Sequence, residues 1–271
     1  MIQPRPKLQR PDDAKTYDLD ESTLVGPPLP GEVVVAQTDQ LVDLLAAEIV
    51  ARAVTCVRQF GDFHLALSGG RTPQPLYERL MYDPNCRQLP WAHTHLWLVD
   101  ERCVGLDDER SNFRMINETI VVHSGIPADH VHAIPAMSET ADSDYESQLR
   151  EVLQRRQPGE DRLDFVLLGM GLDGHTASLF PGLEVLHERI HLIRRVEAKQ
   201  ADPPKRVTMT FPLINAARMI AVLVTGSAKA PMIERLASGH ESLDELPIKG
   251  VLPAQGELKW FLDAQACGHA E

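Results

Sequence analysis

The sequence predicts an α/β fold, a Rossmann-like, mostly parallel sheet with helices on both faces. Two observations lead to this expectation. Short apolar runs such as "VVVA", "THLWLVDE" and "MIAVLVTG" lack the polar alternation of a half-exposed strand, which is typical of strands buried on both faces. Segments with apolar residues at three- and four-residue spacing separate these runs, as the helices between parallel strands would.

The expected elements follow one another from residue 33 onward. Strands are expected over 33–36, 63–69, 94–101, 163–171, 219–226 and 258–263, with further extended segments over 191–196 and 206–211. Helices are expected over 38–60, ended by Gly61, from Thr72 onward, over 111–122 with Ser111 as N-cap, over about 139–156 and over 227–238. Because residues 1–31 are rich in proline, we expect an extended N-terminal arm there, followed by a single α/β catalytic domain over 32–271.

The composition limits the partners that the chain can have. Its 271 residues carry a formal net charge of −12, which argues against binding to duplex nucleic acid but allows a small anion in a locally positive pocket. The four cysteines form neither a disulfide framework nor a zinc-binding pair, and no apolar run reaches the ~20 residues of a membrane span. With no apolar signal segment at the N-terminus, we expect a cytoplasmic protein without membrane partners.

Four segments that follow strands contain the candidate site residues. They read "SGGRTP", "VDERC", "GMGLDGHT" and "TGSAKA". The carboxyl ends of parallel strands meet at one edge of the sheet, and ligands of such sheets bind there. We therefore expect these four segments to meet around one ligand.

The third segment contains a literal G-x-G-x-x-G at Gly169, Gly171 and Gly174. A dinucleotide-binding turn needs a long helix directly afterwards, whereas here only "HTASLF" precedes Pro181. The acidic residue that should follow about 20 positions on is also replaced by a basic stretch, "LIRRVEA". The favoured interpretation is a glycine turn that presents His175 as a general acid and base, with Asp173 beside it. A capping or solvated histidine is the alternative.

The segment "SGGRTP" is expected to hold an anion. Ser68, Gly69 and Gly70 join a strand to a helix that Thr72 would cap, with Pro73 at its first position. Free amides at this positive helix end suit a phosphate group. An ordinary turn without a ligand is the alternative. The candidate cations for the same anion are Lys205, Arg206 and Lys229.

Two further patterns need an interpretation. In "VDERC", Arg102 either stabilises a developing oxyanion, held by a neighbouring carboxylate, or forms only a local ion pair. The segment "HERIH", from His187 to His191, matches the zinc-hydrolase pattern H-E-x-x-H. We disfavour a zinc site, because a following strand leaves little room for the helix and no third ligand stands at the usual spacing.

Taken together, "LALSGGRTPQPLYERL", "WLVDERCVGLDDERSNFRM", "LLGMGLDGHTASLFPG" and "KRVTMTFPLINAARMIAVLVTGSAKA" resemble the glucosamine-6-phosphate isomerase/6-phosphogluconolactonase family over about residues 33–265. The resemblance implies the fold shared by glucosamine-6-phosphate deaminase and ribose-5-phosphate isomerase. It also implies hydrolysis of 6-phospho-D-glucono-1,5-lactone, in the pentose phosphate pathway, without metal or cofactor. One departure is Arg71, where the family usually has serine in S-G-G-S-T-P.

The residues fit this chemistry. His175 would activate water and then protonate the leaving ring oxygen, Asp173 would orient its ring, and Arg102 would stabilise the oxyanion. The substrate phosphate would be held by Ser68, Gly69, Gly70, Arg71, Thr72, Arg206 and Lys229. The alternatives are a sugar-phosphate isomerase or deaminase of the same fold and a non-catalytic sugar-phosphate sensor. The deaminases typically have A-F after "GLDGH" and M-D-E at "VDER", which favours the lactonase. We expect a monomer or a weak homo-oligomer.

Overall fold

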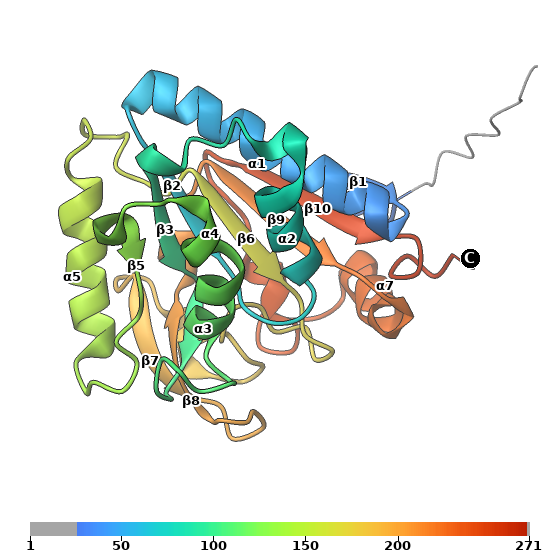
Figure 1. The fold of residues 1–271 in the computed structure, drawn as a ribbon. Coiled ribbons are helices and arrows are strands. Elements are labelled where there is room, and N and C mark those ends of the chain that lie inside the picture. Colours follow the sequence, from blue (N-terminus) through green and yellow to red (C-terminus); the bar gives the residue numbers. More distant parts are fainter. Residues whose placement is uncertain (1–25, 270–271) are drawn as a thin grey trace, which may run out of the picture.

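A seven-stranded parallel sheet forms the centre of the computed structural model, which describes residues 26–269 (Figure 1). The strand order is β1-β10-β9-β6-β2-β3-β5. These strands are β1 (Glu32–Ala36), β2 (Phe63–Leu67), β3 (Thr94–Leu98), β5 (Val131–His132), β6 (Phe165–Gly169), β9 (Met219–Val224) and β10 (Glu257–Asp263). Strands β2, β3 and β9 are buried along their whole length, as their mostly apolar sequences predict, and the polar residues His64, Thr94 and His95 within them are buried as well.

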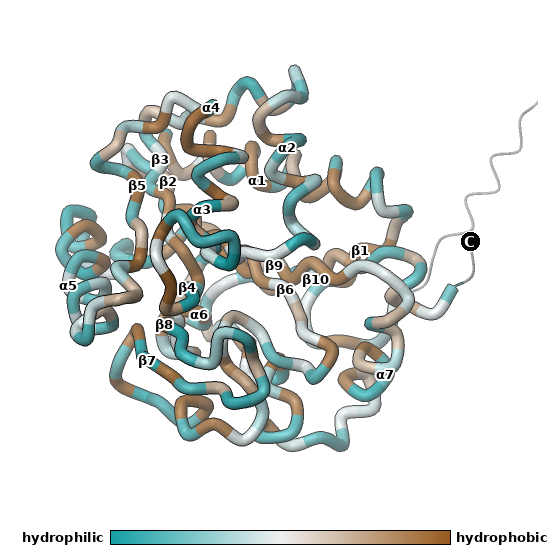
Figure 2. The backbone as a smooth tube through the Cα atoms, turned by 60° about the horizontal axis from the view of Figure 1, so that its bottom comes forward, coloured by the Kyte–Doolittle hydropathy of each residue, from teal (hydrophilic) through white to brown (hydrophobic). Residues whose placement is uncertain are grey.

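Helices cover both faces of this sheet. α1 (Thr38–Phe60), α2 (Gln74–Tyr82) and α3 (Asn112–Ile116) lie on one face, with α5 (Ala141–Leu153) and α7 (Ala230–Ser238) on the other (Figure 2), as right-handed crossovers between strands in this order require. After α3 the helix continues through a π-helical turn (Asn117–Val121) into α4 (Val122–Ser124), and α6 (Phe211–Ile214) precedes β9. The predicted Rossmann-like α/β fold is confirmed.

The strand order reverses between β2 and β6. From β2 the chain continues outward to β3 and β5, whereas from β6 it continues in the opposite direction to β9 and β10. The crossovers on the two sides therefore lie on opposite faces, which opens a crevice at the carboxyl ends of β2 and β6. This is the place where α/β sheets of this kind bind their ligands.

A second, three-stranded antiparallel sheet corrects the predicted strand over 94–101. That strand ends at Leu98, and the next residues form β4 (Asp100–Arg102), which pairs with β8 (Lys205–Met209); β8 in turn pairs with β7 (Ile193–Glu197). Val99 lies between the sheets, because its N–H donates to Leu67 (3.0 Å) and its carbonyl accepts from Met209 (2.8 Å). The pairing with β8, more than a hundred residues away, is what turns the chain out of the main sheet.

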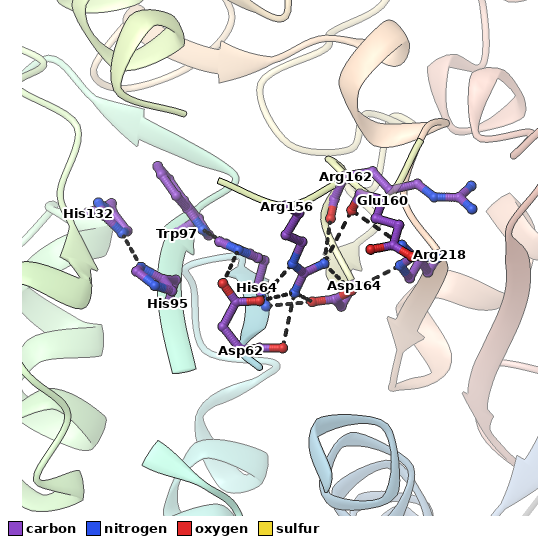
Figure 3. A network of polar contacts seen from close by, with 10 residues as sticks. All are labelled: Asp62, His64, His95, Trp97, His132, Arg156, Glu160, Arg162, Asp164 and Arg218. Atoms are coloured by element: carbon purple, nitrogen blue, oxygen red, sulfur yellow. Dashed lines mark hydrogen bonds and ion pairs between the residues drawn. The ribbon is translucent and has the colours of Figure 1, made fainter. Parts of the chain in front are cut away.

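A polar network closes the amino ends of the strands (Figure 3). Arg156, whose side chain is 2% exposed, binds the carboxylates of Asp62 and Asp164, each at 2.6 Å. Arg218 donates to Asp164 as well (3.1 Å). Beside them, Trp97 donates to His64 (3.1 Å). This edge of the sheet is thus held by paired charges.

Two expectations from the sequence concern the N-terminal arm and membrane-spanning helices. Most of the predicted proline-rich arm, residues 1–25, lies outside the described residues. Its last part packs on the domain: Leu29 is buried, and the carbonyl of Pro30 accepts a hydrogen bond from Trp260 (2.8 Å). Between residues 26 and 269, no helix has the length and apolar character needed to cross a membrane.

Candidate active site

A cavity of about 200 Å³ lies at the carboxyl ends of β2 and β6, where the strand order reverses. Three of the four segments singled out in the sequence contribute to its wall. The predicted site residues that line it are Ser68, Gly69, Gly70, Arg71, Thr72, Arg102, His175 and Arg206. Asp173 and Lys229 stand one contact further away, as described below. The topology has therefore brought together segments that are far apart in the sequence.

His175 and Asp173 form a close pair at this cavity. The Nδ1 atom of His175 lies 2.5 Å from Oδ1 of Asp173, and the ring stacks on Phe180 with centroids 4.2 Å apart. Burial opposes ionisation of Asp173, but the hydrogen bond and charge of His175 outweigh it and lower the pKa of that carboxyl. An ionised Asp173 accepts the Nδ1 proton and leaves Nε2 as the nitrogen that can take up another.

The glycines around this pair explain the G-x-G-x-x-G pattern. A Cβ atom on Gly171 would stand 2.1 Å from Nδ1 of His175, so the imidazole can lie there only over glycine. Gly174 has a φ of +77°, the left-handed conformation that glycine adopts readily. In place of a dinucleotide-binding helix, the chain continues through a short bridge between Thr176 and Leu179. The glycines thus serve to present the histidine.

The loop after β2 forms a cradle of free amides. The backbone N–H groups of residues 69–72 donate to no acceptor in the part of the chain that the structure describes. Gly70, with a φ of +94°, turns the chain here, and Ser68 directs its hydroxyl to the carbonyl of Leu167 (2.8 Å). The cradle ends at the N-terminus of α2, whose positive end favours an anion.

Thr72 was expected to cap α2, and this expectation is wrong. The helix begins at Gln74 with Pro73 as its N-cap, and the first bond of the helix runs from Tyr77 to the Pro73 carbonyl (3.1 Å). A tight turn from Arg71 to Gln74 precedes it and shifts the start of the helix. Thr72 lines the cavity instead.

Two arginines face each other across the small sheet. Arg102 on β4 is the register partner of Arg206 on β8, so both side chains lie on one face of the antiparallel pair. Both residues line the cavity, and neither forms an ion pair with a carboxylate among residues 26–269. Burial lowers the pKa of Arg206, although the charge of Asp100 opposes this. Like charges directly opposite each other are destabilising, so this pair is expected where an anion binds.

The neighbouring carboxylate does not hold the Arg102 side chain, contrary to the prediction. The guanidinium donates to the carbonyl of Arg110 (2.6 Å), and Glu101 accepts only the backbone N–H of Arg102 (2.7 Å). Glu101 instead caps α3, where it accepts from Ser111 Oγ and from the amides of Asn112 and Phe113. Ser111 is the N-cap of α3, as predicted, because its Oγ accepts from the amide of Arg114 (3.1 Å).

The three candidate cations have different positions. Arg206 lines the cavity, whereas Lys205 is exposed at the start of β8 and lies outside the cavity wall. Lys229 donates from Nζ to the carbonyl of Met170 (2.5 Å), a residue of the wall. Burial lowers the pKa of Lys229, with Asp173 opposing that shift.

Among the residues of the wall that the sequence interpretation missed are Asp100 and Asn112. Asp100 accepts hydrogen bonds from Ser178 Oγ (2.6 Å) and from the side-chain amide of Asn112 (3.2 Å). Both residues are buried at the cavity. Asp100 stands at the expected end of a strand and Asn112 at the expected start of a helix. These structural positions explain both residues without a ligand, so nothing in the sequence assigned them to the site.

The zinc-like pattern "HERIH" lies away from this cavity and does not form the required helix. His187 ends a short 3₁₀ turn (Glu184–His187) and pairs with Asp244 (2.8 Å). The carboxylate of Glu188 accepts the backbone amides of the three residues that follow it. No group of three or more His, Cys, Asp and Glu residues within 26–269 is arranged to hold a metal ion.

The fold and the cavity define an α/β protein that places a His–Asp pair next to a loop of free backbone amides. Residues 36–260 match the family described as glucosamine-6-phosphate isomerases/6-phosphogluconolactonase, and the chain belongs to this family.

Relatives and solved structures agree with this assignment. The chain is 40% identical over 238 residues to the human GDH/6PGL endoplasmic bifunctional protein, covering 86% of this chain but only 30% of that protein. It is 40% identical over 224 residues to 6-phosphogluconolactonase of Nostoc sp., covering 80% of this chain and 89% of that protein. A crystal structure of 6-phosphogluconolactonase from Thermotoga maritima superposes with a TM-score of 0.72 at 29% identity, covering 86% and 99% of the two chains.

Proposed function

We propose that this protein hydrolyses 6-phospho-D-glucono-1,5-lactone to 6-phospho-D-gluconate, the second step of the oxidative pentose phosphate pathway. The observation that carries the proposal is the juxtaposition of three elements at one cavity. These are the His175–Asp173 pair, the facing arginines of β4 and β8, and the amide cradle after β2. Relatives that this chain largely covers bear the name of this lactonase.

The reaction needs a base, an oxyanion partner and an acid, and the site supplies each of them. His175 takes a proton from water through Nε2 while Nδ1 stays bonded to Asp173, and the hydroxide attacks the lactone carbon. The electron pair of the C=O bond moves to its oxygen, where Arg102 stabilises the charge. When the tetrahedral intermediate collapses, the bond to the ring oxygen breaks and His175 returns its proton to that oxygen.

The phosphate group anchors the substrate in the same cavity. The free amides of residues 69–72 and the Arg206 guanidinium bind it, with Arg71 at the exposed rim and Lys229 behind the wall. Binding energy from this remote group then holds the lactone carbon near His175.

The test is the initial rate of 6-phosphogluconolactone hydrolysis above its spontaneous background, with and without a strong chelator. Wild type should accelerate the reaction in both conditions, and His175→Ala should lose about 10²–10⁴-fold in kcat. His240→Ala, an exposed histidine away from the cavity, is the matched control. Activity that disappears only with chelator would reject the metal-free mechanism, and full activity of His175→Ala would reject the role of this residue.

We also propose a cytoplasmic location. All four cysteines lie in the described part of the chain and are free thiols, which suits a reducing compartment. Fractionation of cells that express the full chain tests this location. Sedimentation of the purified protein tests the expected monomer or weak homo-oligomer.

A further inference from the structure

We propose that Asn112 is a positioning residue that fixes the anion cradle to the strand carrying Arg102, so that phosphate binding and carbonyl activation act at a set distance. This inference rests on the proposed function, because it assigns the cradle to the phosphate group and Arg102 to the lactone carbonyl. Asn112 is the first residue of α3 and is 2% exposed.

One end of the Asn112 carboxamide is tied to β4. Its Nδ2 atom donates to the backbone carbonyl of Asp100 (2.8 Å) and to the Oδ1 atom of that residue (3.2 Å). Because both partners are acceptors, the amide group must point its nitrogen toward Asp100. Asp100 is itself held by Ser178, whose hydroxyl donates to its other carboxylate oxygen (2.6 Å).

The other end of the carboxamide lies against the cradle. The Oδ1 atom of Asn112 lies 1.8 Å from the place where a Cβ atom on Gly69 would stand, so residue 69 has to be glycine for this contact. This Oδ1 atom is buried and accepts no hydrogen bond from residues 26–269. A buried acceptor without a donor destabilises a fold, and its presence next to a ligand cavity indicates a functional cause.

The backbone of Asn112 is anchored to the same strand. Its N–H donates to Glu101 (2.8 Å), which also accepts the backbone N–H of Arg102 (2.7 Å). Asn112 is therefore fixed to the Arg102 strand through its backbone and through its amide nitrogen, and its oxygen packs on Gly69.

The linkage predicts that Asn112→Ala weakens phosphate binding and hydrolysis of the phosphorylated lactone, but not hydrolysis of the unphosphorylated lactone. The affinity for inorganic phosphate, measured by calorimetry, should fall about tenfold, and kcat/KM for 6-phosphogluconolactone should fall between about tenfold and 10²-fold. Hydrolysis of unphosphorylated glucono-1,5-lactone should keep its wild-type rate, because this substrate does not use the cradle. A merely structural role would lower both lactone rates equally.

A second variant and a control complete the experiment. Gly69→Ala would push the carboxamide oxygen aside while Asn112 remains, so it should reproduce the selective loss if Asn112→Ala does not fold. Asn215→Ala removes an asparagine that bridges Gly250 and Leu252 outside the cavity, and it should leave both affinities and rates unchanged. Unchanged phosphate affinity, or an equal loss on both lactones in both variants, would overturn the inference. A wild type that binds phosphate without hydrolysing the phosphorylated lactone would instead reject the proposed function.

Discussion

Arginines at the two edges of the central sheet stand in opposite surroundings. At the amino ends of the strands, Arg156 binds two carboxylates and further carbonyl oxygens, and Asp164 receives a second arginine as well (Figure 3). At the carboxyl ends, Arg102 and Arg206 face each other and donate only to backbone carbonyls. The first edge pairs its arginines with carboxylates, whereas the second leaves Arg102 and Arg206 without a carboxylate partner in the described part of the chain.

The largest effect on stability should come from breaking the ion pairs of Arg156 at the amino ends of the strands. Arg156→Met would leave the buried Asp164 and the half-buried Asp62 with one partner fewer, which we expect to lower the free energy of unfolding by about 3–5 kcal/mol. The kcat of the folded enzyme should not change. Denaturant unfolding of this variant and of Arg155→Met, an exposed neighbour, measures the difference. A loss below about 1 kcal/mol would show that the network does not stabilise the fold.

The arginines at the carboxyl ends should respond in the opposite way, with a loss of activity and no loss of stability. In Arg102→Ala, kcat for 6-phosphogluconolactone should fall about 10²–10³-fold, because the oxyanion loses its charged partner. Stability should stay the same or rise, since Arg206 loses a like charge opposite it. Arg110→Ala is the control, because the contact of Arg102 is to the Arg110 carbonyl rather than to its side chain. Turnover equal to wild type would remove Arg102 from the mechanism.

Two buried histidines beside the Arg156 network, His95 and His132, also make stability depend on pH. Burial, with the charges of neighbouring histidines, lowers the pKa of His95 and of His132 to about 3, from an ordinary value of 6.5. The unfolded chain therefore binds protons first, so the stabilisation is complete above pH 6.5 and is lost as the pH falls toward 3. Between pH 6 and about 4, each residue should contribute a slope of about 1.4 kcal/mol per pH unit.

Unfolding free energies measured at several pH values in this window check this expectation. His132→Gln should remove about half of the histidine slope, whereas His123→Gln, at an exposed position, should leave it unchanged. A slope that is the same in wild type and in His132→Gln would contradict the assignment. The rate of lactone hydrolysis by the folded protein should not follow this titration, because neither ring is part of the cavity wall.

Local patterns in the sequence were enough to predict one edge and not the other. The glycine turn, the cradle and the arginine of "VDERC" each follow a strand, so their meeting at one edge could be predicted from strand polarity alone. Arg156 carried no such signal, because no strand end precedes it and one of its two carboxylate partners, Asp62, lies 94 residues away in the chain. The turn of β4 out of the sheet, which sets Arg102 opposite Arg206, also depends on a distant pairing. The sequence around Asn112 indicates only the start of a helix, because its contact with Gly69 depends on the tertiary structure.

The smallest effect should come from Arg71, at the exposed rim of the cavity. Arg71 is exposed, so its attraction for the substrate phosphate is weakened by water and salt, and we expect Arg71→Ser to raise KM by at most about fivefold. The increase should shrink as the ionic strength is raised, and kcat should stay constant. Arg87→Ser, another exposed arginine outside the cavity wall, should change neither quantity. A lower KM in Arg71→Ser would mean that a serine hydroxyl binds the phosphate better than this guanidinium. In that case only the guanidinium groups of Arg102 and Arg206, which line the cavity, would contribute positive charge to catalysis.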